Sequence, residues 1–120
     1  MEQPAIEPAP GGGGFAPIHE RIARQACAHP HAPAVTCDGQ SITYAELERR
    51  ANALAAQLQA LGAARDQLVA VGLERSIDMV VALLAVLKSG AAYLPIDLAY
   101  PRSRLEFVLE DARPVAFVTS

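Results

Sequence analysis

The chain has 120 residues, enough for one small domain or for part of a larger one. Its formal net charge is −3 and its basic residues are scattered, which argues against a nucleic-acid-binding surface. The N-terminus lacks the pattern of a secretory signal, and the longest apolar run, residues 79–87, is too short to cross a membrane. We therefore expect a protein of the reducing cytoplasm, with neither nucleic acid nor membrane as a partner.

Residues 1–14 are rich in proline and end in four consecutive glycines. Such a segment has too little apolar surface to offset the entropy of ordering, so we expect a flexible leader. The glycine run predicts no phosphate-binding loop, because no strand precedes it and no Gly-Lys-Ser/Thr follows. The remaining residues, 15–120, form the predicted folded part.

The folded part begins with a helical pattern and a hairpin pattern. Phe15, Ile18, Ile22 and Ala26 recur at helical spacing, and Pro30 ends the run. Two short runs, 34–37 and 40–43, then flank Asp-Gly, a dipeptide that tolerates the positive φ angles of a tight hairpin turn.

The next helix has strong signals at both ends. Thr43 suits the N-cap, Glu46 can reach back to complete a capping box, and Gly62 suits the left-handed position after the helix. Ile42 and Leu47 occupy the two positions of a hydrophobic staple. The apolar stripe comprises Leu47, Ala51, Leu54, Leu58 and Leu61, while Glu48, Arg49, Asn52 and Gln59 face elsewhere.

Three short apolar runs follow, at 68–73, 91–96 and 115–119, separated by helical patterns at 76–89 and 101–112. This alternation predicts an α/β fold, in which a short β-hairpin precedes a three-stranded parallel sheet with right-handed crossover helices. We expect 93–96 to lie in a central strand. The helix at 76–89 is apolar nearly all round, so we expect it to be buried on more than one side.

Ligands of parallel sheets bind beyond the carboxyl ends of the strands. The residues there could bind a polar ligand, but capping and turn roles explain them more simply. They are Glu74, Arg75, Ser76, Asp97, Thr119 and Ser120.

A metal site is the other candidate, because Cys27, His29, His31 and Cys37 lie close together in the sequence. Their spacing matches no standard zinc pattern, so we expect none. There is no Gly-x-Ser-x-Gly, and the one lysine, Lys88, suits a helix end where it complements the dipole. We assign no catalytic, cofactor-binding or metal-binding residue.

Two ordered motifs carry a family resemblance. Residues 43–47, TYAEL, followed by RANALA at 50–55, resemble the first core motif of the adenylation domains of nonribosomal peptide synthetases. Residues 87–101, LKSGAAYLPIDLAYP, resemble the second core motif, and 104–112 resemble the segment after it. Leu98 departs from the proline usual at its position.

The resemblance implies the N-terminal portion of a larger adenylate-forming domain. The complete enzyme would use ATP and Mg²⁺ to make an aminoacyl-adenylate and would load the acyl group on the phosphopantetheine thiol of a carrier domain. Its partners would be the rest of the adenylation domain and the carrier and condensation domains. In the family, the phosphate loop, specificity pocket and mobile lysine lie beyond the position of Ser120, so we expect this chain alone to be inactive.

Two alternatives stay open: a free-standing, noncatalytic protein-binding module, and a fragment of an acyl-CoA ligase-type enzyme. The apolar strand at 115–119 has no following helix to cover it, which favours the fragment and predicts self-association of the isolated chain.

Overall fold

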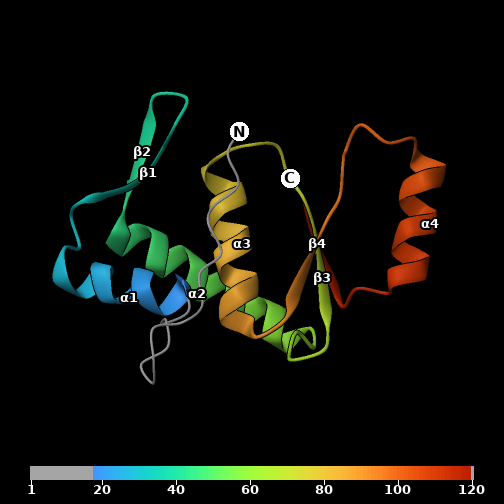
Figure 1. Cartoon of the computed structure of the whole chain (residues 1–120), viewed down its shortest axis with the longest axis horizontal. Coiled ribbons are helices and arrows are strands. Elements are labelled where there is room, and N and C mark those ends of the chain that lie inside the picture. The colour runs from blue at the N-terminus through green and yellow to red at the C-terminus, as the bar shows by residue number, and fades with distance from the viewer. Residues whose placement is uncertain (1–17, 120) are drawn as a thin grey trace, which may run out of the picture.

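The computed structural model describes residues 18–119, so the expected leader at 1–14, Phe15 and Ser120 lie outside the described residues. These residues form four helices and five strands, in the order expected from the sequence, and Figure 1 shows how they are arranged. Their bounds are α1 (Ile18–Ala28), β1 (Pro33–Cys37), β2 (Gln40–Thr43), α2 (Tyr44–Ala60), β3 (Leu68–Gly72), α3 (Ile77–Ser89), β4 (Ala92–Pro95), α4 (Arg102–Ala112) and β5 (Ala116–Thr119).

The hairpin prediction is confirmed. Strands β1 and β2 pair in antiparallel fashion, with Cys37 opposite Gln40. The two residues between them, Asp38 and Gly39, have φ angles of 52° and 78°. Positive φ at both central positions gives the turn the twist of the flanking strands, which is why Asp-Gly marks the hairpin in the sequence.

The N-terminal cap of α2 forms as predicted, but only one half of the capping box does. The Glu46 amide donates to Thr43 Oγ1 at 3.2 Å. The Glu46 carboxylate, which was expected to reach back to Thr43, instead accepts hydrogen bonds from Arg49 and Arg50. Two guanidinium groups within one turn of the helix attract the carboxylate more strongly than a single neutral amide does.

The C-terminal end of α2 is a Schellman motif. The Ala63 amide donates to the Leu58 carbonyl at 2.9 Å, and the Gly62 amide donates to the Gln59 carbonyl at 3.0 Å. Gly62 has a φ of 105°, which a side chain would disfavour. The glycine therefore stops the helix where the sequence predicted.

The second sheet is parallel, as predicted, with the strand order β4-β3-β5. The central strand is β3, so the expectation that 93–96 lie in a central strand was wrong: β4 is an edge strand. Hydrophobic runs report burial but not strand order, and β5 pairs with β3 rather than with β4. The chain thus adds β4 on one side of β3 and then crosses back to add β5 on the other side. As a result, α3 and α4 lie on opposite faces of the sheet (Figure 1).

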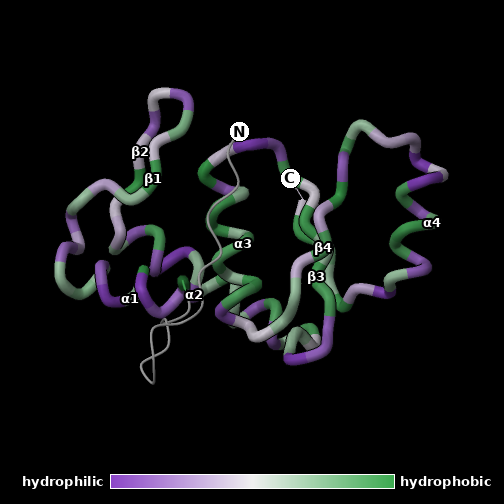
Figure 2. The backbone as a smooth tube through the Cα atoms, viewed as in Figure 1, coloured by the Kyte–Doolittle hydropathy of each residue, from purple (hydrophilic) through white to green (hydrophobic). Residues whose placement is uncertain are grey.

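The core lies on the α3 side of the sheet. Helix α3 contacts α1, α2, β1, β3 and β4, which confirms that it is buried on more than one side. Figure 2 shows the apolar character of α3 and of the neighbouring strands. In contrast, α4 has no buried residue. The most deeply buried large side chains are Leu47, Val69 and Val86.

Candidate functional site

The carboxyl ends of β3 and β5 form the place where a ligand would be expected in an open α/β sheet, because the strand order reverses between them. Thr119 ends β5, and its hydroxyl donates to the Gly72 carbonyl at the end of β3, at 3.1 Å. This hydrogen bond joins the ends of the two strands, so the Thr119 hydroxyl serves the sheet itself.

The other residues predicted at these strand ends serve mainly as caps and turns. The Ser76 hydroxyl accepts from the Met79 amide at 3.2 Å and donates to the Glu74 carbonyl at 2.9 Å, which fixes the start of α3. Asp97 accepts from the Ala99 amide at 2.9 Å in the turn after β4. Glu74 is exposed, as is Arg75.

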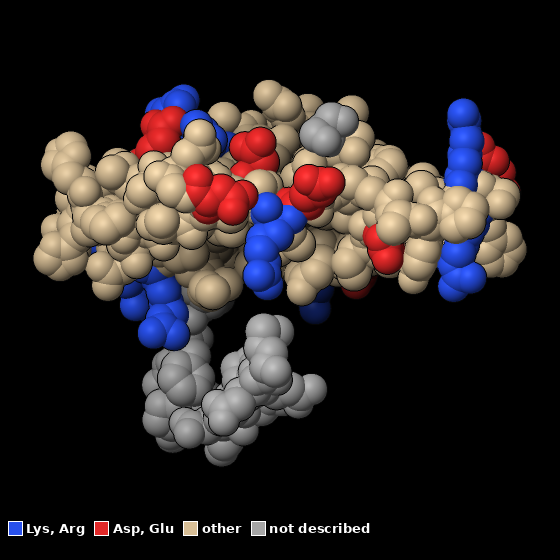
Figure 3. Space-filling view, turned by 90° about the horizontal axis from the view of Figure 1, so that it is seen from above, with Lys and Arg blue, Asp and Glu red and all other residues tan. Residues whose placement is uncertain are grey.

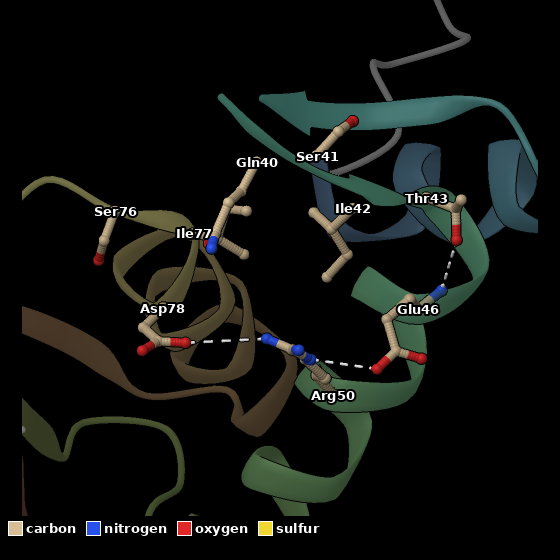
Figure 4. Close-up of a pocket in the computed structure, with 9 residues that line it drawn as sticks. All are labelled: Gln40, Ser41, Ile42, Thr43, Glu46, Arg50, Ser76, Ile77 and Asp78. Carbon is tan, nitrogen blue, oxygen red and sulfur yellow. Dashed lines mark hydrogen bonds and ion pairs between the residues drawn. The ribbon is translucent and has the colours of Figure 1, made fainter. Parts of the chain in front are cut away.

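An open hollow of about 660 Å³ lies beside the start of α3 (Figure 4). Its walls come from β2, from the first two turns of α2 and from the N-terminal turn of α3, elements that are distant in the sequence. The lining residues are Gln40, Ser41, Ile42, Thr43, Glu46, Arg50, Ser76, Ile77 and Asp78. Most of them carry polar or charged side chains.

Arg50 links the two helices that border this hollow. Its Nε lies 3.1 Å from Glu46 Oε1, and its Nη1 lies 3.8 Å from Asp78 Oδ1, as Figure 4 shows. Arg49 donates two further hydrogen bonds to Glu46, at 2.5 and 3.0 Å. The hydrogen bonds from Arg49 and then Arg50 lower the pKa of Glu46 to about 2, and the same contact raises the pKa of Arg49.

The hollow therefore presents carboxylates that already have cationic partners. The described residues do not fit Mg²⁺ and ATP by themselves. Their glycines form no phosphate loop, because Gly39, Gly62 and Gly90 lie at turns or helix ends and Gly72 lies in β3. No group of three or more His, Cys, Asp or Glu within residues 18–119 is placed to hold a metal ion.

An ion pair joins α2 and α3 that the sequence did not predict. Lys88 Nζ lies 2.5 Å from Glu48 Oε1, with only 12% and 17% of the two side chains exposed. From the sequence, Lys88 was expected to complement the dipole of its own helix, and Glu48 was expected to face away from the apolar stripe of α2. No local signal relates the two residues, because their meeting depends on how the two helices pack.

Within residues 18–119, the four residues considered as metal ligands form no group of three or more that could hold a metal ion. Cys27 is exposed on α1, and His29 and His31 are exposed in the following connection. Cys37 is partly buried at the end of β1, with its sulfur 3.9 Å from the Arg75 carbonyl.

Residues of the second motif (87–101) make contacts within the fold, at the end of α3 and after β4. Ser89 is buried and donates to the Val86 carbonyl at 2.6 Å, and Gly90 ends α3 with a φ of 88°. After β4, Ile96 is buried. Just after the motif, the Arg104 guanidinium of α4 lies 4.8 Å from the centre of the Tyr100 ring, a cation–π contact between exposed side chains.

On the face drawn in Figure 3, acidic and basic side chains lie among one another rather than in separate fields. Within residues 18–119, no helix has the length and apolar character needed to cross a membrane.

Comparison with known proteins shows the family to which the chain belongs. The AMP-binding enzyme family model matches residues 22–120. Over 103 residues, the chain is 47% identical to a dimodular nonribosomal peptide synthase from Bacillus subtilis (strain 168), covering 86% of the chain and 4% of the relative. It is 40% identical to tyrocidine synthase 1 from Brevibacillus parabrevis over 119 residues, which cover 99% of the chain and 11% of the relative.

A solved structure agrees with these sequences. It is that of the nonribosomal peptide synthetase FmoA3 in an alpha-methyl-L-serine-AMP bound form. It superposes with a TM-score of 0.83 at 36% identity, covering 96% of this chain and 13% of that one. The chain thus spans a small part of each of these three proteins. It belongs to the AMP-binding enzyme family, and its sequence and fold are those of a part of a nonribosomal peptide synthetase adenylation domain.

Proposed function

We propose that this chain is the N-terminal scaffold of an adenylation domain that activates an amino acid as aminoacyl-AMP in a cytoplasmic peptide synthetase. The observation that carries the proposal is the 47% identity to a peptide synthase across 86% of the chain. The complete enzyme would use ATP and Mg²⁺ and would transfer the acyl group to the phosphopantetheine thiol of a carrier domain. The rest of the adenylation domain, with carrier and condensation domains, would be its partners.

Within that enzyme, the chain's own contribution would be support rather than chemistry. The contacts of its two motifs are a helix cap at Thr43, an ion pair at Lys88 and a helix end at Gly90. Such contacts fix the positions of α2, α3 and β4. We therefore propose that the segments with catalytic and specificity-determining residues dock on this scaffold and that the chain itself selects no amino acid.

A chimaera tests this proposal directly. Residues 22–120 would replace the matching segment of tyrocidine synthase 1, and amino-acid-dependent ATP–pyrophosphate exchange would be measured. We expect the chimaera to retain exchange and to keep the amino-acid preference of the recipient. A folded chimaera that lacks exchange, or one with a changed preference, would contradict the scaffold role.

Two further measurements serve as controls. The same chimaera with Gly90→Val should lose folded protein, because a β-branched residue is strained at a φ of 88°. The 120-residue chain alone should show no exchange. Robust exchange by the chain alone would show that it contains a complete active site and would refute the proposal.

A further inference from the structure

Helix α3 has little polarity to define which of its sides faces which neighbour. Its sequence contains two charged side chains, Asp78 in the first turn and Lys88 in the last. All the residues between them, 79–87, are apolar, and none of these is exposed. Burial alone therefore stabilises several rotations of α3 about its axis by similar amounts, because each rotation replaces one apolar side of the helix with another.

The two charged residues differ in how firmly they can fix this rotation. Asp78 Oδ1 lies 3.8 Å from Arg50 Nη1, and 77% and 44% of the two side chains are exposed, so water competes with the contact. Lys88 Nζ lies 2.5 Å from Glu48 Oε1, with exposures of only 12% and 17%. A charge with so little access to water strongly disfavours any arrangement that removes its partner. The Glu48–Lys88 pair therefore distinguishes the observed rotation from the others.

The rotation of α3 is passed directly to the edge strand β4. Only Gly90 and Ala91 separate the end of α3 from the start of β4. The Ser89 hydroxyl donates to the Val86 carbonyl at 2.6 Å and accepts from the Ala91 amide at 3.4 Å, which ties this connection to the last turn of the helix. Three of the four β4 residues are exposed, so their own packing contributes little to the place of the strand.

We propose that the Glu48–Lys88 pair is a positioning device, which selects one rotation of α3 against α2 and so holds β4 in its pairing with β3. Its effect on the free energy of unfolding is small, because the attraction between the two charges is largely offset by the cost of removing them from water. A single polar contact fixes the register of apolar helices in coiled coils in the same way. The inference refines the proposed scaffold role and rests on it for its purpose in the enzyme, but its test concerns the fold alone.

The test compares local with global stability in the complete 120-residue chain. Amide hydrogen exchange, followed by NMR, measures local opening. The amides of Ala92 and Ile96 form hydrogen bonds of 3.0 and 2.9 Å that tie the two ends of β4 to the β3 segment. The Val115 amide bonds to the Leu68 carbonyl on the β5 side and serves as the internal reference. Urea unfolding gives the global free energy of unfolding.

The decisive variant is the neutral pair, Glu48→Gln with Lys88→Met, which leaves no lone charge between the helices. We expect its free energy of unfolding to remain close to that of the original chain. The Ala92 and Ile96 amides should nevertheless exchange about tenfold faster or more, while exchange at Val115 stays the same.

Two further variants separate positioning from a general loss of charge. Asp78→Asn is the matched control, because it removes the exposed contact between the same two helices, and it should leave all three amides unchanged. The exchanged pair, Glu48→Lys with Lys88→Glu, brings opposite charges together again and should restore slow exchange in β4.

Unchanged exchange at Ala92 and Ile96 in the neutral pair would overturn the proposal. A neutral pair that unfolds readily as a whole, or that exchanges equally faster at Val115, would also overturn it by showing that the ion pair acts on overall stability. Faster exchange in Asp78→Asn, or no recovery in the exchanged pair, would contradict it as well. None of these outcomes bears on the chimaera experiment, so the two proposals can fail separately.

Discussion

The α2–α3 pair and the α4 region differ in how their helices are capped at the N-terminus and in how deeply they are buried. Both α2 and α3 start with a side-chain cap, and an ion pair of low exposure joins them. Helix α4 has Pro101 as its N-cap residue, which offers no side-chain cap; the helix buries no residue, and its Phe107 is 69% exposed. One side of the sheet therefore carries a packed core, while the other presents apolar side chains that have little to pack against, as expected of a scaffold on which further segments dock.

The largest effect that would test this contrast comes from truncating equivalent apolar side chains in the two regions. Leu47 is 1% exposed, so Leu47→Ala should lower the free energy of unfolding by about 2–5 kcal/mol. Phe107→Ala should change it by less than about 0.5 kcal/mol. Urea unfolding followed by circular dichroism measures both. Comparable losses would show that α4 is packed as tightly as α2.

A smaller effect is expected at the end of α3. Gly90 has a φ of 88°, and an alanine there would be strained whatever space surrounds it. We expect Gly90→Ala to cost about 1–2 kcal/mol in the same unfolding experiment. The control is Ala91→Gly at the neighbouring buried position. This substitution increases the backbone freedom of the chain there but imposes no strain on φ. A neutral Gly90→Ala would mean that the chain leaves the helix in another conformation.

The helix caps give the next comparison. Thr43→Ala removes the acceptor for the Glu46 amide and should cost about 1 kcal/mol. Ser103→Ala removes an exposed hydroxyl from the first turn of α4, a helix without a side-chain cap, and should cost little. Equal costs for the two substitutions would remove the distinction between a capped and an uncapped helix.

The smallest effect concerns the pH dependence of α2. The pKa of Glu46 is lowered to about 2 from a model-compound value of 4.5. Because the folded-state pKa is the lower one, this contribution to stability is present above about pH 4.5 and is lost as the pH falls towards 2. Carboxyl-carbon NMR titration should show the Glu46 pKa rising in Arg49→Gln. An unchanged pKa would exclude Arg49 as the main cause.

Local sequence signals predicted the individual elements well, because each depends on a few neighbouring residues. Asp38 and Gly39 define the hairpin turn, while Thr43 and Gly62 define the two ends of α2. The place of β4 at an edge was not predicted, because strand order depends on pairings between distant segments.

The contacts around the hollow show the same limit. The sequence identified Glu46 by its distance from Thr43, but not the competition of Arg49 and Arg50 for its carboxylate. The ion pair between Glu48 and Lys88 requires a particular rotation of α2 against α3, which hydrophobic periodicity does not specify. The local parts of the candidate site were therefore predictable and the tertiary parts were not.

The central position of β3 has a consequence for the order of folding. Its two partners, β4 and β5, both come later in the chain, whereas β1, β2 and α2 are neighbours in sequence. Loop closure must precede each β3 pairing, so we expect the hairpin and α2 to form first and the β3 amides to gain protection last. Pulsed hydrogen exchange during refolding would reveal this order. During synthesis, the apolar β3 segment would then remain without its full set of strand partners until both β4 and β5 have emerged from the ribosome.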